Sequence, residues 1–197
     1  MISDLEKFAN DENNNLPELL KIAIIHYQFE TIHPFLDGNG RIGRLLITFY
    51  LVNKNLLKRP ILYLSDFFEK HRDLYYDNLM LVRTKNDISQ WFKFFLTGII
   101  QTATKGIETF DNILQLQKTL DKQINILGNR SADAKKVISN LFTNPVIDVA
   151  KVGLIIEKSN VSAYKLIADM QELNILQEIT GRGHNRVYAL KKYLDLF

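Results

Sequence analysis

The chain has 197 residues, 46% hydrophobic and 24% charged, which is enough for the core of one large or two small domains. It has no cysteine, which excludes disulfides, thiolate metal sites and cysteine nucleophiles, and its net charge of +3 is too small to indicate nucleic-acid binding alone. No apolar run reaches the ~18–20 residues of a membrane span, and the N-terminus lacks a signal-peptide pattern. We therefore expect a cytoplasmic protein without membrane contact.

Helical periodicity dominates residues 1–128. Pro17 suits the first turn of a helix that runs to Ile32. A second helix follows the glycine-rich stretch 37–43 and should form the buried centre of this domain, since its apolar residues point to all sides. These residues are Leu45, Leu46, Phe49, Tyr50 and Val52.

Two more helices are predicted before the chain changes character. One covers about 65–83, and a long one runs from Ile88 toward Gly128. The length of the second suggests a connecting helix or a homodimer surface, but packing against the first domain is the favoured interpretation. Gly128 marks the predicted domain boundary.

Residues 129–197 read as a second domain. Helices are predicted over 132–142, 148–158 and 162–174, and two strands over 175–179 and 186–190. The turn between the strands is rich in glycine and asparagine, as hairpin loops are. The predicted fold is thus mainly α, a helical bundle followed by a winged helix-turn-helix with a small β-hairpin.

Residues 33–44, HPFLDGNGRIGR, combine several features of a phosphate site. Gly38 and Gly40 allow positive φ, and Asn39 between them tolerates it, so successive N–H groups can form an anion nest. The helix that follows adds its N-terminal N–H groups and dipole. Arg41 and Arg44 share one face of its first turn, and arginine suits phosphate oxygens.

Asp37 and His33 complete the chemistry of this loop. A carboxylate beside a phosphate nest would repel the ligand unless a cation such as Mg²⁺ lay between them. A histidine can accept a hydroxyl proton at neutral pH. Each residue alone is more often structural, but the combination indicates transfer of a phosphorus-centred group. His26, two turns before His33, is expected to be a buried, hydrogen-bonded histidine instead.

The segment resembles the Fic signature His-Pro-Phe-x-Asp/Glu-Gly-Asn-Gly-Arg-x-x-Arg, with every fixed position filled. The similarity extends over about residues 16–110 and includes the run HYQFETI at 26–32 and RDLYY at 72–76. A winged-helix tail is a common companion of Fic domains. The resemblance implies a protein adenylyltransferase that moves AMP from ATP to a Ser, Thr or Tyr hydroxyl of a target protein.

The resemblance also implies roles for individual residues. His33 would be the general base, and Asp37 would hold Mg²⁺ between the α- and β-phosphates of ATP. The anion nest would consist of Gly38, Asn39 and Gly40, and the β- and γ-phosphates would lie on Arg41 and Arg44. Phe35 is expected to anchor the loop in the core. Tyr76 either contacts the nucleoside or packs in the core.

Two features of such Fic proteins are missing from the sequence. An inhibitory Ser/Thr-x-x-x-Glu-Gly/Asn motif is absent, and the nearest match, at 65–70, ends in lysine. Only 32 residues precede His33, too few for the family's upstream helices and target-binding flap. We therefore expect a portion of a longer protein or a short form.

Other functions remain open at this point. A winged helix can bind DNA through residues 162–190, although the candidate recognition helix sets Lys165 against Asp169 and Glu172. The hairpin loop offers Arg182, His184 and Arg186. The chain could then be a transcription regulator whose Fic part senses nucleotide. The same loop could also remove AMP or transfer another phosphate-containing group.

Overall fold

The computed structural model describes residues 1–197, which form two compact units, Met1–Gly106 and Ile107–Phe197. The first unit contains α1 (Ile2–Asn10), α2 (Glu18–Ile32), α3 (Asn39–Asn53), α4 (Ser65–Lys70), α5 (Arg72–Lys85) and the beginning of α6 (Ile88–Ile124). The units divide within α6 and not after Gly128, which lies between α6 and the following helix. The division into domains 1–128 and 129–197 stays a prediction.

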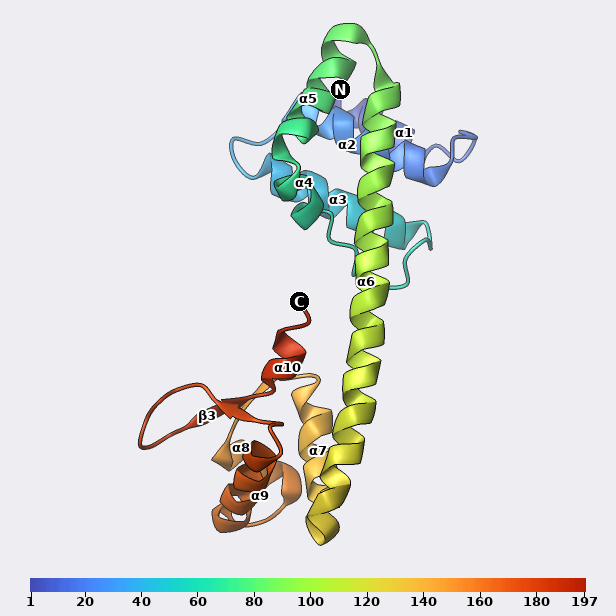
Figure 1. Cartoon of the computed structure of the whole chain (residues 1–197). Coiled ribbons are helices and arrows are strands. Elements are labelled where there is room, and N and C mark those ends of the chain that lie inside the picture. Colours follow the sequence, from blue (N-terminus) through green and yellow to red (C-terminus); the bar gives the residue numbers. More distant parts are fainter. The chain divides into compact units, whose positions relative to one another are not determined.

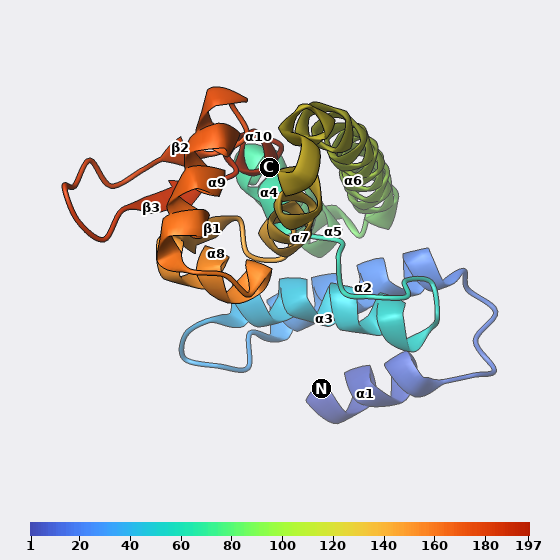
Figure 2. The same ribbon diagram turned by 90° about the horizontal axis from the view of Figure 1, so that it is seen from below.

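The first core forms where α2 lies along α3, as both views of the ribbon show (Figure 1, Figure 2). Trp91 and Phe95 of α6 are fully buried there, and the indole N–H of Trp91 donates to the carbonyl of Ala23, 2.9 Å away. This hydrogen bond satisfies the one polar atom of a large apolar side chain. The packing holds both ends of the predicted loop 33–44, since α2 precedes it and α3 follows it.

Two predictions for this unit are wrong. The α3 helix is not buried all round, because Leu45 and Phe49 are 50% and 55% exposed on the side away from the core. The helix predicted over 65–83 is two helices, α4 and α5, that break at His71. The His71 backbone has φ −115° and ψ 37°, and its ring packs on Phe67 with 4.7 Å between ring centroids.

The second unit follows the order helix, strand, helix, helix, strand, strand. After the 3₁₀ turn η1 (Asn125–Arg130) come α7 (Ser131–Leu141), β1 (Val146–Asp148), α8 (Val149–Ile156), α9 (Asn160–Glu172), β2 (Gln177–Glu178), β3 (Val187–Ala189) and α10 (Lys191–Leu194). The sheet is antiparallel in the order β1-β3-β2, with Tyr188 opposite both Ile147 and Glu178. The three helices and the hairpin are as predicted, while β1, only three residues long, was not predicted.

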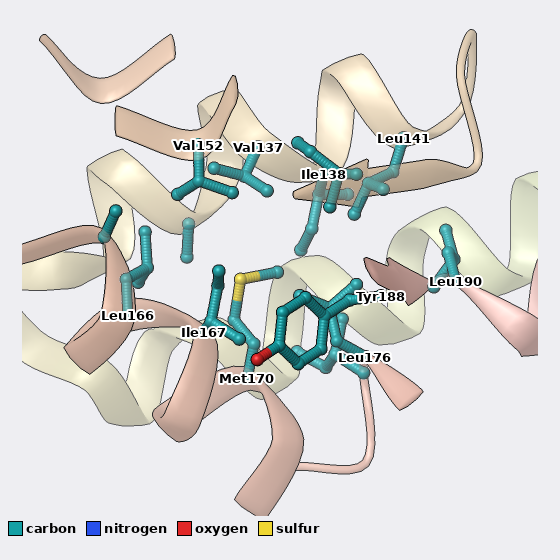
Figure 3. Close-up of a cluster of buried hydrophobic side chains, with 14 of the residues drawn as sticks. Val137, Ile138, Leu141, Val152, Leu166, Ile167, Met170, Leu176, Tyr188 and Leu190 are labelled. Atoms are coloured by element: carbon teal, nitrogen blue, oxygen red, sulfur yellow. The ribbon is translucent and has the colours of Figure 1, made fainter. Parts of the chain in front are cut away.

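The core of the second unit is apolar throughout (Figure 3). Met170 of α9 lies among side chains of α7, α8 and the sheet, and Tyr188 of β3 lies beside Met170 and Leu176. Two helices begin at side-chain caps: Asp148 accepts from the Lys151 N–H at 2.7 Å, and Ser159 accepts from the Ser162 N–H at 3.4 Å. Local capping thus fixes where α8 and α9 begin.

The long helix α6 belongs to both cores. Trp91 and Phe95 pack in the first, whereas Leu120 and Ile124 are buried in the second. The favoured prediction, packing against the first domain, is therefore wrong for the C-terminal part of α6. None of the helices combines the length and the apolar character that a membrane span requires.

Candidate active site

The loop between α2 and α3 begins and ends in left-handed backbone. His33 caps α2 with φ 49° and ψ 59°, and its N–H donates to the Phe29 carbonyl at 3.0 Å. Gly38 caps α3 with φ 82°, a conformation that glycine adopts without strain. The positive φ of His33 is unusual for a residue with a side chain and turns the imidazole out of the helix into solvent.

Asn39 holds the loop in shape from inside. Its side chain is 2% exposed, accepts a hydrogen bond from the Phe35 N–H at 2.9 Å and donates to the Phe35 carbonyl at 2.6 Å. The same amide nitrogen lies 3.1 Å from Nδ1 of His33. A single buried side chain thus connects the histidine, the loop backbone and the start of α3.

These partners determine the tautomer of His33. The backbone groups of Phe35 orient the Asn39 amide, so the nitrogen facing His33 can only donate. Nδ1 must therefore accept, and in the neutral imidazole the proton lies on Nε2. In this arrangement the basic lone pair of His33 is occupied by Asn39.

The predicted phosphate cradle is the N-terminus of α3 and not a nest of left-handed residues. Only Gly38 of the three predicted nest residues has positive φ, because Asn39 and Gly40 already belong to α3. Their N–H groups lie in the first turn, where they lack partners within the helix. The 15-residue helix therefore presents N–H groups and its dipole to the loop.

Asp37 and Arg41 form an exposed pair at the mouth of the loop. Asp37 Oδ2 lies 3.3 Å from Arg41 Nη2, and Oδ1 accepts from the Gly38 N–H at 2.7 Å. The Asp37 side chain is 94% exposed. No cluster of three or more His, Asp or Glu side chains could hold a metal in this chain. One accessible carboxylate fits a Mg²⁺ ion that takes its other ligands from phosphate oxygens and water.

Arg44 leaves the loop and lines a pocket of about 270 Å³. The other lining residues are Phe68, Glu69, Arg72, Tyr75 and Tyr76. A Cβ on Gly40 would lie 3.3 Å from Arg44 Nη1, so the guanidinium runs beside the backbone of the cradle. Tyr76 is 56% exposed, and the Arg72 guanidinium lies over its ring, with 5.9 Å between Cζ of Arg72 and the ring centroid. The predicted residue Tyr76 and the signature arginine Arg44 therefore share one pocket.

A buried network around His26, whose partners the sequence did not predict, supports this pocket. His26 Nδ1 lies 3.0 Å from the Gly43 carbonyl, and Nε2 lies 3.0 Å from the Tyr75 hydroxyl. Because a carbonyl only accepts, Nδ1 carries the proton and the Tyr75 hydroxyl donates to Nε2. Burial lowers the pKa of His26 to about 4, against the opposing effect of the Gly43 bond. His26 is the buried, hydrogen-bonded histidine that was predicted.

One predicted role does not fit. Phe35 was expected to anchor the loop in the core, but its side chain is 48% exposed and contacts only the edge of the core through Phe29, with 6.3 Å between ring centroids. The loop is instead anchored through the backbone of Phe35, because its N–H and its carbonyl both form hydrogen bonds with the buried Asn39 amide. A polar side chain within the motif thus does what the aromatic residue was expected to do.

Comparison with known proteins agrees with the signature. Residues 1–51 match the Fic/DOC family. The chain is 26% identical over 135 residues to a probable protein adenylyltransferase of Aquifex aeolicus, covering 60% of this chain and 41% of that protein. It is 33% identical over 153 residues to the protein adenylyltransferase Fic of Aedes aegypti, covering 70% of this chain and 29% of that protein.

The fold agrees as well. A Fic family protein from Desulfovibrio desulfuricans superimposes with a TM-score of 0.51 at 23% identity, over 96% of this chain and 53% of that one. The N-terminal part of the chain therefore matches the Fic/DOC family, and the chain has a Fic-type helical fold. The chain spans less than half the length of these two curated relatives.

Proposed function

We propose that this chain carries the active site of a protein adenylyltransferase, which transfers AMP from ATP to a hydroxyl side chain of a target protein. The single observation that carries the proposal is that His33 and Asp37 lie on the loop that leads into the first turn of α3, with Arg44 about one turn further along the same helix. The relatives named protein adenylyltransferase support the same reaction.

The proposed reaction gives each group of the loop and of the first turns of α3 a separate role. The hydroxyl oxygen of the target attacks the α-phosphorus, its proton passes to His33, and the bond from the α-phosphorus to the bridging oxygen breaks to release pyrophosphate. The N–H groups of Gly38, Asn39 and Gly40 and the two guanidiniums of Arg41 and Arg44 would hold the phosphates. Positioning and charge neutralisation are the main contributions a protein makes to such a transfer.

Two steps must precede the transfer in this arrangement. Asp37 would coordinate Mg²⁺ through Oδ2 once Arg41 turns from it to the phosphates; the metal would neutralise charge on the phosphate chain. His33 accepts a proton only at a nitrogen with a free lone pair. Asn39 must therefore release Nδ1 in either case; Nδ1 is then the base, or the imidazole proton moves from Nε2 to Nδ1 and Nε2 becomes the base.

The nucleoside would lie in the pocket beside Arg44. Tyr76 is exposed and lines this pocket, so it can stack on a purine, and the neighbouring Arg72 adds a second planar group. Its exposure favours nucleoside contact over the packing role that the sequence left open.

Labelling with ATP tests the proposal. We expect incubation with α-labelled ATP and Mg²⁺ to label this chain or a protein in an extract, and His33→Ala to abolish the label. The control is His184→Ala, an exposed histidine of the second unit. Label from the γ-phosphate in place of the α-phosphate, or release of AMP from a modified protein, would establish one of the other reactions. The absence of all three would contradict a catalytic role.

The second unit supports a second candidate function. Its order of elements is that of a winged helix, and we propose that residues 162–190 contact DNA. Arg182, His184 and Arg186 are exposed on the hairpin loop, and Arg130 pairs with Asp169, which removes one negative charge from the face of α9. Duplex DNA binding whose affinity falls with salt and is lost in Arg182→Ala/Arg186→Ala would support it. Binding that survives the double substitution would contradict it.

A homodimer and a cytoplasmic location stay predictions. Ile107, Phe110 and Leu114 form an exposed apolar row on α6, each more than half exposed, and are the residues to test for a dimer. Sedimentation of the wild-type chain and of Phe110→Glu would decide whether this row holds two copies together. The lack of cysteine fits a reducing compartment.

A further inference from the structure

Glu30 lies one turn before His33 on α2, outside the signature, and its carboxylate is partly buried. Its Oε1 is fully covered by protein and forms no hydrogen bond. The oxygen rests on the backbone of Gly43, where a Cβ would overlap it. A buried carboxylate oxygen without a partner is costly, so its position calls for a compensating charge.

Arg44 has the complementary property. Its Nε is also covered by protein and without a hydrogen bond, although the guanidinium reaches the pocket. Gly43, which the Glu30 carboxylate contacts, is the chain neighbour of Arg44 on α3. Two buried groups of opposite charge, neither with a hydrogen bond, thus belong to the same α2–α3 contact.

The charges around Glu30 agree with this geometry. Burial raises the pKa of Glu30, and the positive charges of Arg44 and His33 oppose that rise. Glu30 and Arg44 also act in opposite directions on the pKa of the buried Tyr75, which burial itself raises. These directions agree with the contact between Glu30 and Gly43, the chain neighbour of Arg44, and no ion pair with Glu30 occupies the guanidinium.

We propose that Glu30 is a positioning residue that holds Arg44 in the nucleotide pocket through its counter-charge, an inference that rests on the proposed function. Without the carboxylate the buried part of Arg44 would be an uncompensated cation, and the side chain would turn to solvent. The guanidinium would then no longer be preorganised for a phosphate. Because the carboxylate contacts α3 through Gly43 and leaves the guanidinium unpaired, it orients Arg44 without competing for it.

Glu30→Gln tests this role, since it keeps the shape and removes the charge. We expect the dissociation constant for Mg·ATP to rise about 10-fold, KM for ATP to rise in parallel and kcat to change less than about twofold. Glu12→Gln, which removes the same charge from an exposed loop, is the control and should leave the dissociation constant unchanged. Unchanged or tighter binding by Glu30→Gln would overturn the proposal.

A double-mutant cycle separates positioning from a merely structural role. In an Arg44→Ala background, Glu30→Gln should change Mg·ATP binding less than about twofold, because its effect passes through Arg44. An equal loss in both backgrounds would mean that Glu30 only supports the fold, and would overturn the proposal.

A measurement without nucleotide distinguishes failure of this inference from failure of the proposed function. The Nε–H of Arg44 is buried, so its NMR signal, assigned with Arg44→Lys, should exchange slowly with water. In Glu30→Gln it should exchange at least about 10-fold faster. Failure of the wild type to bind Mg·ATP would refute the proposed function and, with it, the nucleotide part of this inference. An unchanged exchange rate in Glu30→Gln would refute the positioning of Arg44 by Glu30 and would leave the proposed function untouched.

Discussion

The Asn39 side-chain amide donates a hydrogen bond to Nδ1 of His33 over 3.1 Å. Since Asn39 is also bonded to both backbone groups of Phe35, it sets the position and the tautomer of the proposed base together. The arrangement resembles the use of a fixed partner to orient a catalytic imidazole, with an amide donor in place of a carboxylate acceptor.

The tautomer is open to direct observation. We predict that neutral His33 carries its proton on Nε2, because Nδ1 accepts from Asn39. Nitrogen NMR of labelled chain, above the pH at which the ring is protonated, should give the signal of an unprotonated Nδ1. In Asn39→Ala the two tautomers should mix. A protonated Nδ1 in the wild type would contradict the orientation of the Asn39 amide.

Asn39→Ala should also disable the loop. The substitution leaves the Phe35 N–H and carbonyl without their partners, which costs about 1–3 kcal/mol of folding stability. AMP transfer should fall about 100-fold, because small displacements of reacting groups have large effects on rate. Thermal melting and labelling rates measure the two effects, and Asn13→Ala, an exposed loop substitution, is the control. A normal rate would mean that Asn39 is dispensable for the geometry of the loop.

Gly43 is predicted to be required by packing and not by backbone conformation. A Cβ there would overlap Glu30 Oε1 and lie 3.2 Å from both His26 Cε1 and Phe29 Cδ1. The overpacking costs about 1–3 kcal/mol and outweighs the gain of about 1 kcal/mol from replacing glycine in a helix. We therefore expect Gly43→Ala to lower the free energy of unfolding by up to about 2 kcal/mol in urea titrations.

Gly106→Ala is the matched control for this experiment. Gly106 lies inside α6 with nothing within 4 Å of an added Cβ, so alanine should stabilise the helix by about 0.5–1 kcal/mol. Equal effects of the two substitutions would contradict the close approach of α2 and α3 at Gly43.

The loop could be predicted from the sequence because its parts are contiguous. The residues from His33 to Arg44 are held together by short connections, so their types and spacing are enough to indicate one phosphate site. The left-handed His33 and the helical Gly40 were not predictable, since both depend on where α2 ends and α3 begins. The three helices and the hairpin of the second unit were likewise visible in local periodicity and turns.

The support beneath the loop could not be predicted, because it joins residues far apart in the chain. The bond between His26 and Tyr75 crosses 49 positions, and it forms only when α5 packs against α2. The break at His71 and the three-residue strand β1 give too short a signal for periodicity. Gly43 occupies a position of the signature at which any residue type is allowed. The signature therefore does not predict its contact with Glu30.

The buried His26 predicts that stability falls in mild acid. Its pKa is lowered to about 4 in the folded chain from an ordinary 6.5, so the unfolded chain binds the extra proton between these values. The free energy of unfolding should therefore be full above about pH 6.5 and decrease by about 3 kcal/mol as the pH falls to 4. Urea titrations across this range measure the slope.

Two variants identify His26 as the source of this slope. His184→Gln, on an exposed loop, should retain it, whereas His26→Gln should lose it. If His26→Gln does not fold, the imidazole signal of His26 in the wild type serves instead, and should stay that of a neutral ring down to about pH 4. Protonation of this ring at pH 6 in the folded chain would contradict the burial of His26 between Gly43 and Tyr75.

Asp37→Asn separates metal binding from folding. The Asp37–Arg41 pair is exposed on both sides, and such pairs add little stability, so the melting temperature should not change measurably. The Gly38 N–H can still donate to the amide oxygen, which keeps the loop shape.

Mg²⁺ should strengthen ATP binding about 10-fold in the wild type and less than about twofold in Asp37→Asn, because an amide is a poorer Mg²⁺ ligand than a carboxylate. Asp111→Asn, on the exposed side of α6, controls for the change in net charge. Calorimetric titrations with and without Mg²⁺ decide the matter: an Asp37→Asn chain that keeps the full metal effect would show that another group holds the ion.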